Sequence, residues 1–399
     1  MSSERTRVAV LGSTGSIGRQ ALDVLAAHRA RFEVVALAAG SDAQRLSAQA
    51  NEHRPRVVHL AAAVRAPALD VPPGTTIERD ASALEALSTR DDVDLVLVAT
   101  GGIVSLRPVL AAFGAGKVVA TANKETLVAG GHLVMPFARR LAASAGDDPL
   151  AWLRPIDSEH SAIWQCLAGE RVADVRRLVL TASGGPFRTW SAEQLAGATP
   201  RDALAHPTWR MGAKITVDSA TLVNKALEVI EARWLYDVAD EQIDVVVHPQ
   251  SIIHSLVEFA DGSFKAQLGL PDMRIPIQYA LTYPSRAPSP AAALDLLALP
   301  ALAFEPVDDA RFPALALGRA AGRAGPRASA ALIAADEVAV ARFLDGSVDF
   351  PGIAELCRRA VERFGGGAGA PDLTGLLELD GEVRAWAATE RVGAASGAA

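Results

Sequence analysis

The sequence is short of cysteine and of long apolar runs. Its 399 residues include only Cys166 and Cys357. Two cysteines build neither a disulfide framework nor a cysteine metal cluster, so we expect a protein of a reducing compartment, the cytoplasm. No apolar run is long enough to span a membrane and no signal-peptide core is found, so we expect no membrane partner. The net charge of −7 argues against nucleic acid as a partner, because binding phosphates needs a basic surface.

Lysine and asparagine are also scarce, although arginine is abundant. Lysine occurs at five positions and asparagine at three. The dipeptide Asn-Lys nevertheless occurs twice, at 123–124 and at 224–225. A compact ammonium and a short amide cannot be exchanged for a guanidinium without a change of geometry. The two pairs are therefore candidate functional positions, and a chance repeat is the alternative.

The N-terminal residues have the pattern of a dinucleotide-binding turn. A buried-strand pattern over 7–11 (RVAVL) runs into GSTGSIG at 12–18, and a helical pattern follows over 19–27. Glycines let backbone amides approach a pyrophosphate, and a helix N-terminus favours an anion. The spacing is GxxGxxG instead of GxGxxG, and a tight strand-to-helix turn without a ligand is the alternative.

The next strand leaves the choice between NAD and NADP open. A strand over 32–38 is followed by Gly40, Ser41 and Asp42. No acid closes the strand itself, where NAD-binding sites hold the ribose diol. Ser41 and Arg45 favour a 2′-phosphate, whereas Asp42 argues the other way.

Strand patterns over 57–60, 93–99 and 117–120 alternate with helical ones, which predicts a doubly wound parallel sheet. Ligands of such sheets bind outside the carboxyl ends of the strands. The first Asn-Lys pair is therefore expected beside the cofactor crevice. A chain of this length is expected to form two or three domains.

Two carboxylates follow the next strand end. Asp157 and Glu159 come directly after Arg154-Pro155, and Ser158 is a suitable N-cap for a helix over 160–167. If the backbone there is extended, both carboxylates point to one side. Oxygen ligands in this arrangement suit Mg²⁺ or Mn²⁺. A solvated acidic turn is the alternative.

The central part of the chain offers further polar groups. Ser183-Gly184-Gly185 follows a strand over 177–180 and could hold an anion, or be an ordinary turn. The segment 206–214 has no apolar period and is expected to be a loop that closes over a ligand or packs on the core. A helix is predicted over 219–236, with Asn224, Lys225 and Glu228 on its polar side.

The C-terminal third shows no cluster of polar chemistry. A Pro- and Ala-rich stretch over 284–306 is typical of a linker, and helical patterns follow at 315–343, 353–364 and 373–390.

These features together describe a reductase for a phosphorylated hydroxyketone. Hydride transfer needs the dinucleotide, and a carboxylate-bound metal can polarise a ketone. The donors of Ser183, Ser219, Asn224 and Lys225 suit a phosphate.

The chain resembles the 1-deoxy-D-xylulose 5-phosphate reductoisomerase family along nearly its whole length. The resemblance is carried by GSTGSIG (12–18), ANKE (122–125), PIDSEHSAI (155–163), SGGPF (183–187), the very specific block 206–235 and HPQSIIHS (248–255).

The resemblance implies a set of site residues. Metal ligands are Asp157, Glu159 and Glu228, for Mg²⁺, Mn²⁺ or Co²⁺. Phosphate-binding residues are Ser183, Ser219, Asn224 and Lys225. Other substrate contacts are Lys124, Ser158, His206 and Trp209, with Trp209 in a lid loop, and Lys124 counts as catalytic together with the metal ligands. NADPH contacts are Thr14, Gly15, Ser16, Ile17, Gly40, Ser41, Asn123, Glu125 and Gly212.

The resemblance also implies the architecture and the reaction. We expect an α/β protein with an N-terminal Rossmann-like doubly wound sheet over 1–150. A central α+β catalytic and dimerisation domain with the lid loop follows over 151–285, then a linker (286–311) and a C-terminal helical domain (312–399). The reaction implied is a metal-assisted rearrangement of the carbon skeleton, then reduction by NADPH, in a homodimer of isoprenoid precursor biosynthesis.

One departure concerns the cofactor. Family members often carry Lys-Asn after the glycine at 40, where this chain has Ser41-Asp42. NADPH is still expected to be favoured over NADH. A semialdehyde dehydrogenase is the enzyme alternative, but it would need a catalytic cysteine at a strand end. A redox-sensing nucleotide-binding protein is the non-enzyme alternative, and it predicts no metal dependence.

Overall fold

The computed structural model describes residues 5–61, 69–80, 82–209, 211–367 and 369–392. The chain divides into two compact units. The first unit comprises 1–123, 134–161 and 272–292, and the second comprises 124–133, 162–271 and 293–399. The division into four segments expected from the sequence, with boundaries after residues 150, 285 and 311, remains a prediction.

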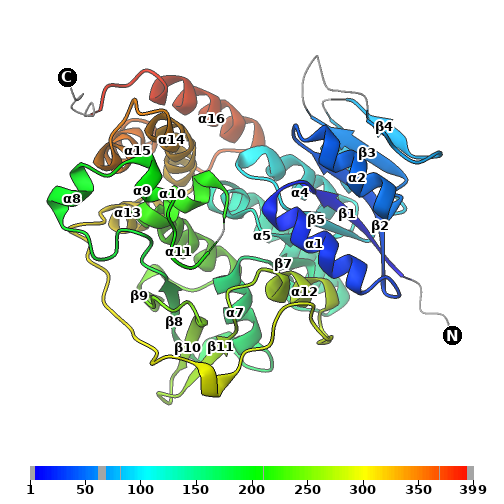
Figure 1. The fold of residues 1–399 in the computed structure, drawn as a ribbon, viewed down its shortest axis with the longest axis horizontal. Coiled ribbons are helices and arrows are strands. Elements are labelled where there is room, and N and C mark those ends of the chain that lie inside the picture. The colour runs from blue at the N-terminus through cyan, green and yellow to red at the C-terminus, as the bar shows by residue number, and fades with distance from the viewer. Residues whose placement is uncertain (1–4, 62–68, 81, 210, 368, 393–399) are drawn as a thin grey trace. The chain divides into compact units, whose positions relative to one another are not determined.

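The first unit is built on a parallel sheet of seven strands in the order β4-β3-β2-β1-β5-β6-β7 (Figure 1). The strands are β1 (Thr6–Leu11), β2 (Phe32–Ala39), β3 (Val57–Leu60), β4 (Thr76–Glu78), β5 (Leu95–Val98), β6 (Val118–Thr121) and β7 (Leu153–Pro155). The strand order reverses between β1 and β5, which is the point where open α/β sheets bind ligands. The expected Rossmann-like sheet is therefore confirmed.

Helices of the first unit connect these strands. The inner strands β2, β5 and β6 are mostly buried apolar runs, as parallel strands covered on both faces require, whereas the edge strand β4 is partly exposed. The helices are α1 (Ser16–Ala27), α2 (Ala43–His53), α3 (Ala83–Ser88), α4 (Leu106–Gly114), α6 (Pro149–Trp152) and α12 (Arg274–Thr282), with a 3₁₀ turn at Ile103–Ser105. Two more helices, α5 (Lys124–Ala145) and α7 (Ser158–Leu167), contribute residues to both units.

The second unit combines a four-stranded sheet with a group of helices. The strand order is β11-β10-β8-β9, with β8 and β9 parallel and the other pairs antiparallel. The strands are β8 (Val175–Ala182), β9 (Ile243–Val247), β10 (Ile253–Phe259) and β11 (Phe264–Leu268). The helices are α8 (Ala192–Ala196), α9 (Pro200–Ala203), α10 (Ala213–Thr221), α11 (Val223–Tyr236), α13 (Ala314–Ala324), α14 (Pro326–Leu344), α15 (Phe350–Phe364) and α16 (Leu373–Ala387). The expected α+β part and the C-terminal helices are both present.

The helix expected over 219–236 is in fact two helices. Leu222 has φ 61° and ψ 14°, a left-handed conformation that interrupts the helical hydrogen bonds. Ser219 therefore lies near the end of α10, and Asn224 lies in the first turn of α11. A leucine at positive φ is strained, so packing of the surrounding helices must hold it there.

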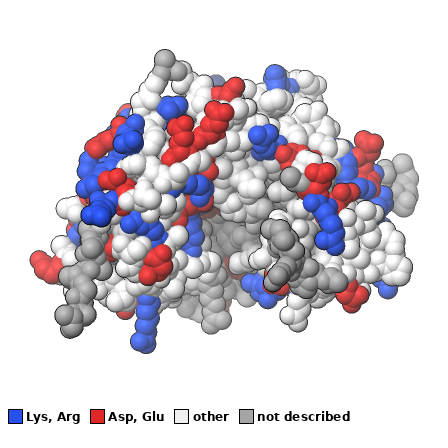
Figure 2. Space-filling model, turned by 90° about the horizontal axis from the view of Figure 1, so that it is seen from above, with Lys and Arg blue, Asp and Glu red and all other residues white. Residues whose placement is uncertain are grey.

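Two observations describe the helices and one face of the surface. Among the described residues, none of the helices combines the length and apolar composition that a membrane span requires. On the face drawn in Figure 2, basic and acidic side chains lie interspersed.

Candidate active site

The turn between β1 and α1 has the geometry that a pyrophosphate needs. Gly12 has φ +86°, and a Cβ there would lie 2.5 Å from Ala99 O. A Cβ on Gly18 would lie 2.2 Å from Gly12 O. Helix α1 has neither a side-chain cap nor an acid in its first turn. Its amide groups are therefore open to an anion, next to the predicted cofactor residues Thr14, Gly15, Ser16 and Ile17.

The end of β2 places a guanidinium beside this turn. Asp42 caps α2, because its Oδ1 accepts a hydrogen bond from Arg45 N at 2.9 Å. Arg45 Nη1 lies 3.2 Å from Asp42 Oδ2 and donates to Thr14 O at 3.4 Å. Gly40 and Ser41 are exposed. The Asp42 carboxylate, which by itself would favour NAD, thus accepts a hydrogen bond from the first turn of α2 and forms an ion pair with Arg45.

Asn123 ties the ends of β5 and β6 together. Its side-chain amide donates to Thr100 O at 2.9 Å and to Gly102 O at 2.8 Å. Asn123 is almost completely buried. Its role requires two N–H donors on a short side chain, which explains why asparagine is kept here in a chain that otherwise avoids it.

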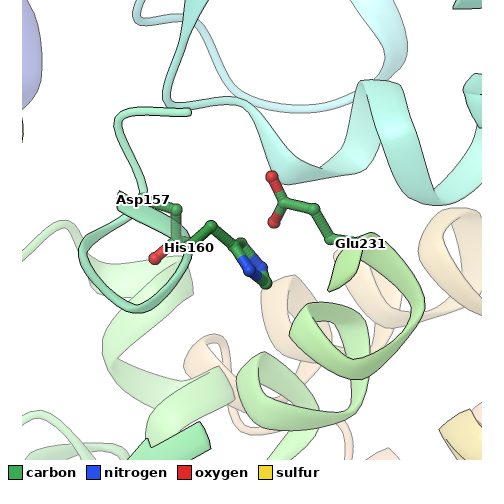
Figure 3. A group of neighbouring side chains, drawn as sticks. All are labelled: Asp157, His160 and Glu231. Atoms are coloured by element: carbon green, nitrogen blue, oxygen red, sulfur yellow. The ribbon is translucent and has the colours of Figure 1, made fainter. Parts of the chain in front are cut away.

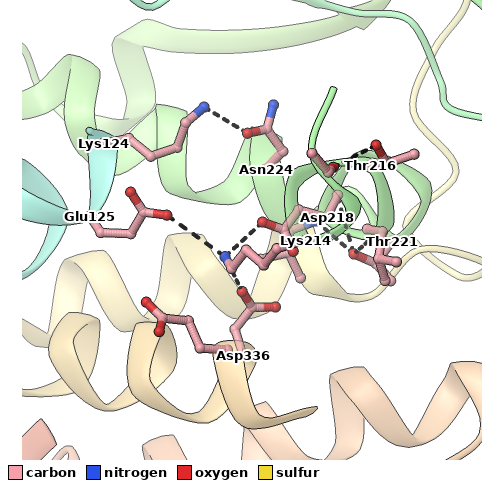
Figure 4. Close-up of polar contacts among 12 residues, drawn as sticks. Lys124, Glu125, Lys214, Thr216, Asp218, Thr221, Asn224 and Asp336 are labelled. Atoms are coloured by element: carbon pink, nitrogen blue, oxygen red, sulfur yellow. Dashed lines mark hydrogen bonds and ion pairs between the residues drawn. The ribbon is translucent and has the colours of Figure 1, made fainter. Parts of the chain in front are cut away.

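Three side chains surround the Glu228 carboxylate in the second unit. Lys124 Nζ lies 3.0 Å from Oε1, and Lys225 Nζ lies 2.5 Å from Oε2. Asn224 donates to Oε1 at 2.5 Å and accepts from Lys124 at 2.6 Å (Figure 4). Lys225 also donates to Thr181 O at 2.5 Å. Lysines from the two Asn-Lys pairs therefore meet at one carboxylate.

The burial of this group decides whether its residues form a solvated helix face or a buried polar cluster. Glu228 is 0% exposed, and Lys124 and Lys225 are 5% and 3% exposed. A solvated helix face is thereby excluded. Buried charges need partners of opposite sign, and both lysines have one in Glu228. The polar cluster is therefore part of the packed interior and not a chance arrangement of surface side chains.

A second polar group joins two serines through a histidine. His206 Nε2 lies 3.0 Å from Ser183 Oγ and 3.2 Å from Ser219 Oγ. His206 Nδ1 accepts hydrogen bonds from Thr208 N at 3.1 Å and Trp209 N at 2.9 Å. Because Nδ1 accepts, the proton of the neutral ring is on Nε2 and points to the serines. Burial lowers the pKa of His206, which favours this neutral form.

The glycine turn after β8 allows this close approach. Gly185 has φ +64°, and a Cβ there would lie 2.8 Å from Ser219 O. Gly185 N donates to Ser183 Oγ at 3.2 Å. The chain around Ser183 thus packs directly on the end of α10, and two predicted phosphate-binding hydroxyls share one imidazole.

The paired carboxylates of the first unit lie at the start of α7. Ser158 is the first residue of this helix, so the expectation that it caps the helix from outside is wrong. Ser158 Oγ donates to Glu159 Oε2 at 2.5 Å. One carboxylate oxygen of Asp157 and one of Glu159 lie within 4.8 Å of each other. Although Glu159 is helical and not extended, the two acids remain close enough to share a cation.

His160 follows these acids and is completely buried. One of its ring nitrogens lies within 4.8 Å of an Asp157 carboxylate oxygen. Asp157 directly precedes α7, and His160 lies in the first turn of that helix (Figure 3). His160 was not among the predicted site residues, although its place three residues after Asp157 was a signal.

One further residue, Lys214, was missed. Lys214, in the first turn of α10, forms ion pairs with Asp218 and Asp336. It is one of only five lysines, which was the available signal. Arg45 was considered for a 2′-phosphate, but its contact with the glycine turn depends on long-range folding. The predicted residues Glu125 and Gly212 lie beside this lysine: Glu125 is 3.8 Å from it, and Gly212 precedes α10.

Comparison with known proteins identifies the family. The model of 1-deoxy-D-xylulose 5-phosphate reductoisomerase matches residues 8–131. The models of its C-terminal domains match residues 153–236 and 268–386. A reductoisomerase of Heliobacterium modesticaldum is 49% identical over 398 residues, covering 97% of both chains. One of Anaeromyxobacter sp. is 52% identical over 358 residues, covering 89% of this chain and 90% of the relative.

Solved structures of the same family are also similar to this chain. A crystal structure of DOX-P reductoisomerase with NADPH, fosmidomycin and magnesium has a TM-score of 0.86 and 37% identity, and the alignment covers 96% of this chain and 97% of that one. A Zymomonas mobilis reductoisomerase in complex with NADPH has a TM-score of 0.84 and 37% identity, covering 96% and 98%.

The glycine turn on a doubly wound sheet and the buried clusters of acids and cations define a dinucleotide-dependent oxidoreductase of the α/β class. Within that class, the chain belongs to the 1-deoxy-D-xylulose 5-phosphate reductoisomerase family.

Proposed function

We propose that this enzyme isomerises and reduces 1-deoxy-D-xylulose 5-phosphate to 2-C-methyl-D-erythritol 4-phosphate, a step of isoprenoid precursor biosynthesis. The observation that carries the proposal is the buried group of Lys124, Asn224, Lys225 and Glu228 in a chain of this family. This group combines a carboxylate of the kind that binds metal ions, Glu228, with ammonium and amide groups that can donate hydrogen bonds to substrate oxygens.

The metal site is proposed to consist of Asp157, Glu159 and Glu228. The donor set fits a hard cation, because all three ligands are carboxylates and the first two lie within 4.8 Å of each other. Mg²⁺ or Mn²⁺ is expected, and Co²⁺ is a further candidate. When bound, the metal polarises the substrate ketone and steadies neighbouring oxyanions.

The phosphate group of the substrate is assigned to Ser183, Ser219, Asn224 and Lys225. The two serines lie on the same imidazole, and the neutral His206 keeps their hydroxyls oriented. Lys124 and Ser158 are expected to hold substrate oxygens near the metal ligands. The segment 206–212, which carries Trp209, is expected to close over the site and exclude water.

NADPH is the proposed hydride donor. The open N-terminus of α1 and the residues Gly40, Ser41 and Asn123 form its expected path, with Glu125 and Gly212 at the nicotinamide end. The fit rests on the uncapped helix start and on the close packing at Gly12 and Gly18. With Asp42 engaged, Arg45 and Ser41 are the groups proposed to favour the 2′-phosphate.

The test is a chelator titration of NADPH oxidation in the presence of the deoxyxylulose phosphate. We expect activity to fall with chelation and to return on adding Mn²⁺ or Mg²⁺. Activity that survives complete chelation would reject the metal-dependent reaction. A semialdehyde dehydrogenase finds no support, because Cys166 and Cys357 are both buried on helices.

A homodimer is proposed as the working assembly. Strand β11 is an edge strand, and it exposes 50% of Phe264 and 38% of Leu268. Exposed apolar side chains on a sheet edge favour pairing with a second copy. Phe264→Glu should shift the sedimentation of the protein to that of a monomer, whereas the exposed-site control Val104→Glu should not. A wild-type monomer would refute the assembly. We place the enzyme in the cytoplasm, where its two free cysteines would stay reduced.

A further inference from the structure

Lys214 joins three carboxylates in the second unit. Its Nζ lies 2.7 Å from Asp218 Oδ2, 2.6 Å from Asp336 Oδ2 and 3.8 Å from Glu125 Oε1 (Figure 4). The acids come from three different helices, α10, α14 and α5. We call these four residues the Lys214 cluster. None of the roles assigned above explains why a lysine is placed here.

The cluster carries more negative than positive charge. The side chains of Asp218 and Asp336 are 3% and 0% exposed, and that of Lys214 is 30% exposed. Among the described residues, the second oxygen of each aspartate, Oδ1, has no hydrogen-bond partner. The neighbouring acid, Glu337, is already paired with Arg384 at 2.6 Å. Lys214 is therefore the cation that makes this arrangement of acids tolerable.

Electrostatics within the cluster agree with this geometry. Burial raises the pKa of Asp218 well above its usual value, and the charge of Asp336 adds to the effect while Lys214 opposes it. Burial alone would lower the pKa of Lys214, but the carboxylates of Asp218, Asp336 and Glu125 raise it well above the usual value. Lys214 thus stays charged at neutral pH.

Three members of the cluster lie within two positions of a residue of the proposed site. Glu125 follows Lys124, and Asp218 precedes Ser219. Lys214 stands two residues after Gly212, where the segment 206–212 ends and α10 begins. The fourth member, Asp336, lies on α14, which packs against α10, α15 and α16. Because these helices hold α14 in place, Asp336 anchors the other three residues of the cluster.

We propose that Lys214 is a positioning residue of the reductoisomerase reaction. It holds the first turn of α10 on α14 and beside the start of α5. This fixes the Ser219 hydroxyl and the end of the segment 206–212 relative to Lys124. The inference rests on the proposed function for its kinetic consequence, but the positional claim stands on the ion pairs alone.

The alternative is that the cluster only compensates charge. Two variants separate the two roles. Lys214→Met removes the cation and leaves buried acids without a partner. Lys214→Met combined with Asp336→Asn also removes one acid, so it restores the charge balance without restoring the tie to α14. Lys214→Arg keeps the charge, and Lys117→Met is the control, because Lys117 lies directly before β6 in the first unit, outside the cluster and outside the proposed site.

The kinetic test measures KM and kcat for 1-deoxy-D-xylulose 5-phosphate, together with the thermal midpoint. A displaced phosphate donor weakens a hydrogen bond to a charged group, so KM should rise about tenfold in Lys214→Met. The double variant should regain the thermal midpoint but keep the raised KM. Lys214→Arg should recover part of the loss, and Lys117→Met should match the wild type. A double variant with normal KM as well as normal midpoint would overturn the proposal.

A second readout needs no activity. Hydrogen–deuterium exchange over residues 206–221 should be faster in both Lys214→Met proteins than in the wild type and in the Lys117→Met control. Unchanged exchange would contradict the tie between α10 and α14. If the wild type shows no turnover of the deoxyxylulose phosphate, the proposed function fails, and the exchange result still decides the positional claim. If the single variant does not fold, the double variant carries both measurements.

Discussion

Replacing Glu228 by glutamine tests the buried cluster most severely. The Glu228 side chain is 1% exposed and accepts hydrogen bonds from two ammonium groups, those of Lys124 at 3.0 Å and Lys225 at 2.5 Å. Glutamine keeps the shape and one acceptor oxygen but removes the charge. Two buried ammonium groups would then lose their shared anion.

The size of the effect follows from this burial. Removing one partner of a buried ion pair costs about 3–5 kcal/mol. Because the remaining amide oxygen still accepts one hydrogen bond, we expect the lower end, about 3 kcal/mol. That is less than the usual total stability of about 5–15 kcal/mol, so the variant should still fold. Turnover should drop strongly, since a proposed metal ligand loses its charge.

The assay is urea unfolding of the metal-free protein, monitored by circular dichroism. The matched control is Glu362→Gln, because Glu362 forms an ion pair with Arg358 on the surface of α15 and is 61% exposed. Such a pair is worth no more than about 0.5 kcal/mol. If both variants shift the transition equally, Glu228 does not carry the two lysine charges, and the reasoning about the cluster fails.

Three further outcomes are expected. Lys225→Ala should mainly raise KM, since a lost phosphate contact weakens substrate and transition state alike, and an unchanged KM would remove Lys225 from the phosphate site. Arg45→Gln should weaken NADPH binding by about 5- to 30-fold, the effect of a half-exposed charged hydrogen bond, measured by fluorescence titration. The affinity of Arg45→Gln for NADH should stay constant. The control Arg29→Gln, at an exposed arginine, should keep its affinity for NADPH. If Arg45→Gln lost the same affinity for both cofactors, Arg45 would not recognise the 2′-phosphate. Because burial lowers the pKa of His206, the hydrogen bonds that its Nδ1 accepts are intact above about pH 6.5 and are lost as the pH falls through the lowered pKa. KM should therefore rise in acid, and a KM that stays constant down to the pH at which the protein unfolds would contradict this.

Local signals were enough to predict much of the first unit. The strand over 7–11 and the turn at 12–18 are found as β1 and the start of α1, because glycines and apolar runs act through their immediate neighbours. Strand Val57–Leu60 was predicted to the residue. The scarcity of lysine and asparagine also pointed correctly to buried polar groups, since selection keeps such residues only where geometry demands them.

Errors arose where tertiary packing overrides local preference. A continuous helix over 219–236 was expected because Leu222 is a good helix former, yet packing holds it at φ 61°. The helix expected over 315–343 is broken at Gly325-Pro326, and that pair of residues was a readable signal.

Long-range partners could not be predicted at all. Lys214 and Asp336 are more than a hundred positions apart in the sequence, and no local pattern predicts that they form an ion pair. The same holds for the approach of Gly185 to Ser219 O. Such contacts exist only once the helices and the second sheet have packed.

The central claim is that Asp157, Glu159 and Glu228 bind one divalent cation together. The most direct measurement is Mn²⁺ binding to the metal-free enzyme, followed by electron paramagnetic resonance, in the wild type and in Asp157→Asn, Glu159→Gln and Glu228→Gln. We predict a single site per chain that each of the three substitutions weakens. Wild-type Mn²⁺ affinity in Glu228→Gln would contradict the account.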